Sequence, residues 1–111
     1  MLKKLALSAL IVTAAGSTAF GAAKLNTWQV KALKIVKTEK KVLDAKWRAP
    51  ESNVLYVSMA PDGSRRDGFA QYLCMVFAKA GAPEGELKTV FIYDPLNYES
   101  GNQSMGMAAC R

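Results

Sequence analysis

The first 23 residues have the layout of a secretory signal, and this layout limits what the rest of the chain can fold into. Lys3 and Lys4 precede an apolar run at 5–15, and small residues cluster at 16–23. A basic end, an apolar helix and a small-residue cleavage site follow one another in export signals. The apolar run has 11 residues, whereas a membrane span needs about 20. We therefore expect residues 1–23 to be a cleaved secretory signal peptide rather than an anchor.

Cleavage after Ala23 leaves residues 24–111 as a single domain, and a cut after Gly21 is the alternative that fits the same small-residue rule. The 88 remaining residues (111 − 23) bury only roughly 60–65% of the surface of the unfolded chain, so the domain has a small core. We expect this domain in the periplasm or outside the cell.

The two cysteines offer a covalent staple for so small a core. Cys74 and Cys110 are the only cysteines of the chain, and disulfides persist in the oxidising environment that exported proteins meet. A bond between them closes a loop of 37 residues (110 − 74 + 1), which the chain-entropy model values at about 4 kcal/mol. We expect this intramolecular disulfide. Two free thiols and an intermolecular bond are the alternatives.

The composition excludes several kinds of site. The chain contains no histidine, which removes the commonest general base, the Ser-His and Cys-His nucleophile pairs and the commonest zinc ligand. Two cysteines 36 positions apart are too few for a thiolate cluster and too distant for a C-x-x-C redox pair. The sequence has no phosphate-binding glycine loop and no catalytic serine motif. We expect no catalytic residue, no metal and no cofactor.

The hydrophobic pattern predicts the order helix, strand, strand, helix, strand. We expect these elements at 28–39, 42–48, 54–59, 68–80 and 87–94. Apolar residues recur at helical spacing in the two helices, namely Trp28, Ala32, Ile35 and Val36 in the first and Phe69, Leu73, Val76, Phe77 and Ala80 in the second. Strict alternation of apolar and polar residues indicates a strand in the segment after Lys41. One continuous helix over 28–47 is the alternative.

This order is typical of an α+β fold. We expect a small two-layer sandwich of order α-β-β-α-β, with both helices on one face of a three-stranded sheet. The first two strands form a hairpin through the turn at 49–53, and the second helix connects the second and third strands in parallel. We expect Ser64 to cap the second helix, and the tail to be irregular until Cys110.

The segment from Val54 to Cys74 carries a family resemblance. It reads VLYVSMAPDGSRRDGFAQYLC and resembles a family of short exported bacterial proteins. These proteins share a Leu-Tyr-Val strand, an Asp-Gly-x-Arg-Arg-Asp-Gly turn, a helix with tyrosine and cysteine, and a late cysteine. The resemblance implies an envelope location and supports the pairing of Cys74 with Cys110. It implies no catalytic residue.

Positive charge is concentrated at the start of the mature chain. Residues 24–48 contain eight Lys or Arg and two Asp or Glu, a net charge of +6. Residues 49–111 contain five Lys or Arg and seven Asp or Glu, a net charge of −2. Basic residues near Trp28 and Trp47 fit an anionic partner, with peripheral contact to an anionic membrane surface as one candidate. We expect no nucleic acid, because it is scarce outside the cytoplasm. A solvated lysine face that binds nothing is the alternative.

The turn before the second helix is the second candidate site. Its candidate anion- or partner-binding residues are Gly63, Ser64, Arg65, Arg66 and Gly68. Two guanidinium groups next to backbone N–H groups can receive a carboxylate or phosphate. In the alternative interpretation, Asp62 and Asp67 neutralise the arginines and the turn is structural.

The sequence therefore predicts a non-catalytic exported envelope protein. It would bind an anionic or protein partner through the basic helix and the arginine-bearing turn, with the partner's identity and the oligomeric state left open. The alternative is an enzyme inhibitor or a small hydrolase-like enzyme that uses Arg65 and Arg66 with a carboxylate.

Overall fold

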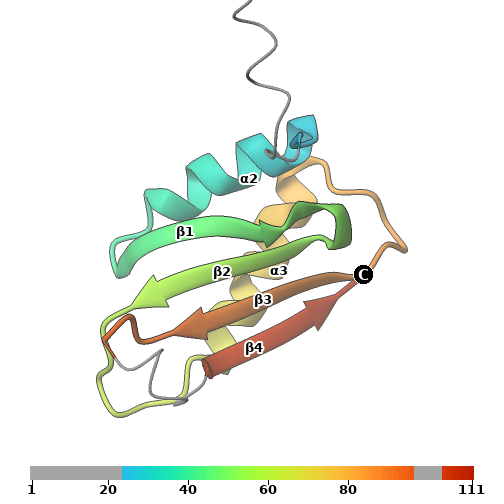
Figure 1. The fold of residues 1–111 in the computed structure, drawn as a ribbon. Coiled ribbons are helices and arrows are strands. Elements are labelled where there is room, and N and C mark those ends of the chain that lie inside the picture. Colours follow the sequence, from blue (N-terminus) through green and yellow to red (C-terminus); the bar gives the residue numbers. More distant parts are fainter. Residues whose placement is uncertain (1–23, 97–103) are drawn as a thin grey trace, which may run out of the picture.

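Two helices cover one face of a four-stranded sheet in the computed structural model (Figure 1). The structure describes residues 24–96 and 104–111, so the expected signal peptide lies outside the described residues. The elements are α2 (Thr27–Lys37), β1 (Val42–Ala49), the short 3-10 helix η2 (Pro50–Ser52), β2 (Val54–Met59), α3 (Asp67–Ala80), β3 (Lys88–Tyr93) and β4 (Ser104–Cys110).

The strands lie in the order β1-β2-β3-β4. The pairs β1/β2 and β3/β4 are antiparallel, and β2 and β3 are parallel. The predicted hairpin and the predicted parallel pair connected by α3 are therefore confirmed, and the continuous helix over 28–47 is wrong. Helix α2 lies over β1, α3 lies over β3 and β4, and the two helices pack against each other.

The prediction of three strands is wrong, because residues 104–110 form β4 instead of an irregular tail. This segment reads SMGMAAC and contains no β-branched or aromatic residue, so its local composition does not indicate a strand. The strand is specified by its pairing with β3, which runs in register from Lys88 opposite Cys110 to Ile92 opposite Gly106. The strand forms because a neighbouring edge supplies its backbone hydrogen bonds.

The start of α3 also differs from the prediction. The helix begins at Asp67 with Arg66 at the cap position, and Ser64 does not cap it. Ser64 instead closes a tight turn, because both its N–H and its hydroxyl donate to Asp62 Oδ1, over 3.0 and 2.6 Å. The helix ends at Ala80 as predicted, and Gly81 caps it in the left-handed conformation with φ 100°.

The predicted apolar faces of both helices form the core. Trp28, Trp47 and Phe77 meet at its centre, with ring centroids 5.4 to 5.5 Å apart. Both tryptophans are buried, and the indole N–H of Trp47 donates to the backbone carbonyl of Gln29 over 3.0 Å. Leu43 departs from the expected alternation and is 61% exposed, because β1 has an irregularity between Val42 and Asp44.

A buried amide pair connects α2 to the β1–β2 turn. Asn53 has φ 58° and ψ 46°, a left-handed conformation that asparagine tolerates better than most residues. Gln29 Nε2 donates to Asn53 Oδ1 over 3.0 Å and to the carbonyl of Pro50 over 2.9 Å. Asn53 Nδ2 donates to the carbonyl of Leu87 over 3.2 Å, just before β3. One amide pair therefore holds three separate segments together.

The predicted disulfide between Cys74 and Cys110 is confirmed, with 5.9 Å between the two Cα atoms. It joins the middle of α3 to the last residue of β4. A disulfide of this kind is typical of proteins that work outside the cytoplasm.

We predict that the Asn53 side chain stabilises the fold through its hydrogen bonds as well as through its backbone conformation. Asn53→Gly keeps the left-handed conformation accessible and leaves the buried Gln29 amide without one acceptor, so we expect a loss of about 1–3 kcal/mol. Asn53→Ala should lose about 1–2 kcal/mol more, because alanine is strained there. Urea unfolding measures both. An Asn53→Gly variant as stable as the wild type would show that the amide network contributes nothing.

We also predict that the disulfide is needed to hold β4. Thiol titration of the purified, oxidised protein should find no free thiol. Cys74→Ser with Cys110→Ser should cost about 2–4 kcal/mol of stability, which lowers the melting temperature by roughly ten degrees or more in a domain of this size. Two reactive thiols in the oxidised protein would contradict the prediction.

Candidate functional site

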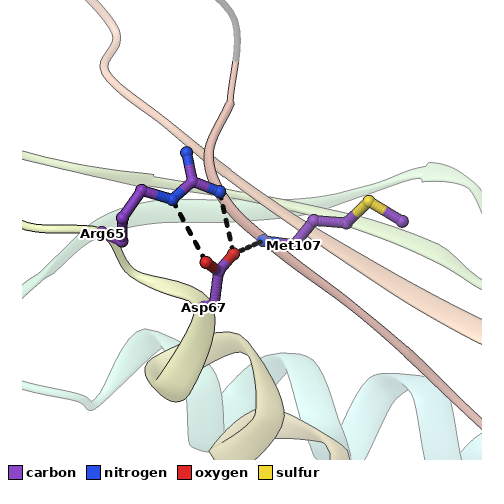
Figure 2. A network of polar contacts seen from close by, with 3 residues as sticks. All are labelled: Arg65, Asp67 and Met107. Carbon is purple, nitrogen blue, oxygen red and sulfur yellow. Dashed lines mark hydrogen bonds and ion pairs between the residues drawn. The ribbon is translucent and has the colours of Figure 1, made fainter.

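The predicted arginine turn lies between β2 and α3, against β4. Arg65 binds Asp67 with both arms of its guanidinium group: Nε donates to Oδ2 over 3.1 Å and Nη2 donates to Oδ1 over 3.0 Å. The backbone N–H of Met107 donates to the same Oδ1 over 3.0 Å, as Figure 2 shows. Asp67 therefore connects the arginine to the β4 backbone.

Arg66 turns in a different direction. Its Nη2 donates to the carbonyl of Ala60 over 2.8 Å, and its Nη1 lies 3.6 Å from Asp62 Oδ2. Only 11% of its side chain is exposed, and its backbone N–H donates to the carbonyl of Met105 over 2.8 Å. The two guanidinium groups thus do not face one common hollow.

Gly106 shows how closely the turn and β4 approach each other. A Cβ atom at this position would lie 2.5 Å from the carbonyl carbon of Arg66 and 2.8 Å from the backbone nitrogen of Asp67. By contrast, a Cβ atom on Gly63 or Gly68 would meet nothing within 4 Å. The close packing therefore lies on the β4 side of the turn, and the candidate residues Gly63, Ser64 and Gly68 are exposed.

The charges of the turn are balanced locally. The hydrogen bonds from the Arg65 side chain and from the Met107 N–H lower the pKa of Asp67. The hydrogen bonds from the Ser64 hydroxyl and N–H lower the pKa of Asp62. Both shifts favour the ionised carboxylates that lie beside the arginines. This is the arrangement expected of a structural turn that anchors β4.

The basic helix offers a different surface. Lys31 and Lys34 border a shallow groove of about 410 Å³ that is also lined by Leu25, Thr27 and Val30. Val30 is 50% exposed. Both lysines are exposed, and neither forms an ion pair with another described residue. Cationic and apolar groups therefore share one solvent-facing surface.

The two predicted components do not form one site. Helix α2 lies along the β1 edge of the sheet, whereas the arginine turn lies beside β4 at the other edge (Figure 1). Any partner that contacts the lysines of α2 is therefore separated from the arginine turn by the width of the sheet.

Sequence reasoning missed a third cluster, on the face of the sheet that neither described helix covers. Lys46, Arg48, Tyr56 and Tyr93 line a hollow of about 170 Å³ there. The guanidinium carbon of Arg48 lies 5.8 Å from the Tyr56 ring centroid. The alternation within each strand could have indicated which residues point away from the core. Only the strand register could show that these residues, from three strands, meet.

Neither described helix combines the length and the hydropathy that a membrane span requires. Within residues 24–96 and 104–111, no three carboxylate or thiol side chains come together as metal ligands would.

In comparisons with known proteins, no family model, curated protein or solved structure matched the chain significantly. The resemblance of the Val54–Cys74 segment to short exported bacterial proteins therefore stays a prediction.

The arginine turn generates a prediction about acid stability. Folding lowers the pKa of the Asp67 carboxyl below its ordinary value of 3.8. Such a group stabilises the protein at pH values above 3.8, and this contribution is lost as the pH falls below that value. Asp67→Asn should therefore be less stable than the wild type at neutral pH. Between about pH 5 and about pH 3, the variant should lose less stability than the wild type does. Urea unfolding at several pH values measures both effects.

Asp44→Asn is the matched control, because Asp44 is exposed and only approaches Lys37 to 3.7 Å. Surface pairs of this kind contribute little, so this variant should keep the wild-type pH profile. Identical profiles for Asp67→Asn and Asp44→Asn would show that Asp67 does not anchor β4 in the way described.

Proposed function

We propose that this protein is a non-catalytic exported envelope protein that binds an anionic partner through the lysine-rich surface of α2. The observation that carries the proposal is the pair Lys31 and Lys34, whose exposed ammonium groups form no ion pair with a described residue. Apolar side chains lie among these lysines. Here Leu25 and the half-exposed Val30 line the same groove.

This mixture of groups favours a membrane surface as the anionic partner. Lysine side chains attract anionic head groups, while neighbouring apolar side chains enter the boundary between head groups and acyl chains. The tryptophans of the basic segment do not contribute, because both are buried in the core. Val30 and Leu25 supply the apolar contact in their place.

In this proposal the arginine turn has a structural role: it holds β4 and does not bind the partner. Arg65 is engaged by Asp67 and Arg66 by Ala60 and Asp62, so an anionic ligand would have to displace bonds that already exist. The alternative of a hydrolase-like enzyme gains no support from this geometry. Asp67 is held in its ionised form by three donors, and a carboxylate with a lowered pKa is a weak general base at neutral pH.

The proposal predicts that Lys31→Glu with Lys34→Glu weakens binding to vesicles that contain phosphatidylglycerol. Each lysine near an anionic surface contributes about 1 kcal/mol, so removing both attractions should cost about 2 kcal/mol, or roughly thirty-fold in affinity. Sedimentation of the purified, oxidised protein with vesicles measures this loss. Binding should weaken further at high salt and be absent with neutral phosphatidylcholine vesicles.

Lys79→Glu with Arg111→Glu is the matched control, because it changes the net charge by the same amount at exposed positions outside α2. The control should bind nearly as the wild type does, and both double variants should keep the wild-type melting temperature. Equal losses in the two variants would indicate a general effect of net charge, and no loss in either would overturn the proposal.

A further inference from the structure

The face of the sheet opposite the helices carries an ordered row of side chains. In the central strands, Leu55 and Val57 of β2 and Val90 and Ile92 of β3 are buried in the core. The residues between them, Tyr56 and Phe91, therefore point to the other face, since alternate residues of a strand point to opposite faces. The register places Lys46, Tyr56, Phe91 and Met107 opposite one another across all four strands. We call this surface, with Arg48 and Tyr93, the open face.

One end of the open face is cationic. Lys46 and Arg48 are both exposed and line the hollow of about 170 Å³ together with Tyr56 and Tyr93. Arg48 stands two residues after Lys46 in β1, while Ala45 and Trp47 are buried, so the alternation of the strand places both cations on this face. Neither cation forms an ion pair with another described residue.

The size and charge of this hollow define what it can hold. Sites that enclose a whole drug-sized ligand have volumes of about 300–1,000 Å³, so the hollow of about 170 Å³ can hold only one group of a larger ligand. A guanidinium and an ammonium group that line the same hollow complement a carboxylate or phosphate. The cationic end therefore fits a single anionic substituent.

The rest of the open face is aromatic and ends in a methionine. The Tyr56 ring lies 5.5 Å from Phe91 and 5.8 Å from Tyr93, between centroids. Beyond Phe91, the row ends at Met107, which is 44% exposed. From β2 to β4 the row spans two strand spacings, or about 10 Å. The ligand that fits it is therefore extended and lies on apolar ring surfaces, while its outer side stays in water.

We propose that the open face binds an acidic oligosaccharide, a chain of sugar rings that carries carboxylate groups. The C–H face of a sugar ring packs on an aromatic side chain, and its hydroxyl groups on the other side remain hydrated. A carboxylate on one ring enters the hollow between Lys46 and Arg48, and the next rings lie over Phe91 and Met107. An acyl chain would need an enclosed apolar cavity, and the described residues do not enclose the open face.

Single-stranded nucleic acid is also anionic and ring-bearing, but the ring geometry disfavours it. Base stacking needs flat aromatic faces that are open to solvent. Arg48 lies over the Tyr56 ring, and the planes of Phe91 and Tyr93 are inclined to it by 61° and 58°. The neighbouring rings are thus not parallel and do not form one continuous platform for a stack of bases, whereas a single sugar ring needs only one aromatic ring.

The test is a titration of the purified, oxidised protein with trigalacturonate, followed by the amide signals in NMR spectra. We expect the largest shifts in β1, β2 and β3 around Lys46, Tyr56 and Phe91. Lys46→Gln with Arg48→Gln should weaken binding at least tenfold and leave the melting temperature unchanged. Phe91→Ala should also weaken binding, and its NMR spectrum will show whether it is folded. Absence of shifts at millimolar trigalacturonate overturns the proposal.

Three further arms separate the alternatives. The fully methyl-esterified trisaccharide should bind at least tenfold more weakly, and equal binding would overturn the role given to the two cations. A trinucleotide of thymidine should bind more weakly than trigalacturonate, and tighter binding would assign the open face to nucleic acid. The α2 variant Lys31→Glu with Lys34→Glu should bind trigalacturonate as the wild type does. Failure of this proposal is therefore distinguishable from failure of the membrane proposal.

Discussion

The buried amide pair of Gln29 and Asn53 is the contact on which the arrangement of the layers depends. A polar pair inside a small core must be fully satisfied, because an unpaired amide there costs more than the bond itself contributes. This requirement sets where α2 can lie along β1, since the pair also engages the β1–β2 turn and the start of β3. The Trp28–Trp47–Phe77 cluster adds attraction, but apolar packing alone would allow α2 to slide.

The other edge of the sheet is held by different means. The segment that forms β4 has little tendency to be a strand, and four contacts hold it in place. It pairs with β3, and the disulfide joins it to α3. The carbonyl of Met105 accepts a hydrogen bond from the Arg66 N–H, and the N–H of Met107 donates one to the Asp67 carboxylate. The absence of a side chain at Gly106 permits the close approach. The arginine-rich turn, the most conspicuous motif of the sequence, thus has a clear structural role at this edge.

The domain presents different chemistry on its two layers. The lysines of α2 lie on the helical layer, and the cations of β1 lie on the opposite face of the sheet beside aromatic rings. The concentration of positive charge in residues 24–48 therefore divides into two surfaces. The two proposed ligands, a membrane surface and an acidic oligosaccharide, would therefore contact opposite layers of the domain.

The sequence by itself determined both helices, three strands, the hairpin, the parallel crossover and the disulfide. The helices and strands follow from apolar spacing over a few residues. The hairpin and the crossover follow from the order of these elements and the lengths of their connections, and the disulfide follows from the count of cysteines. Only the tertiary structure decided that residues 104–110 form a strand, that Gln29 meets Asn53, and that the two arginines turn to separate partners. It also brought Lys46, Tyr56 and Phe91 together. Contacts between residues tens of positions apart depend on strand register, and register is set by the packing of the whole core.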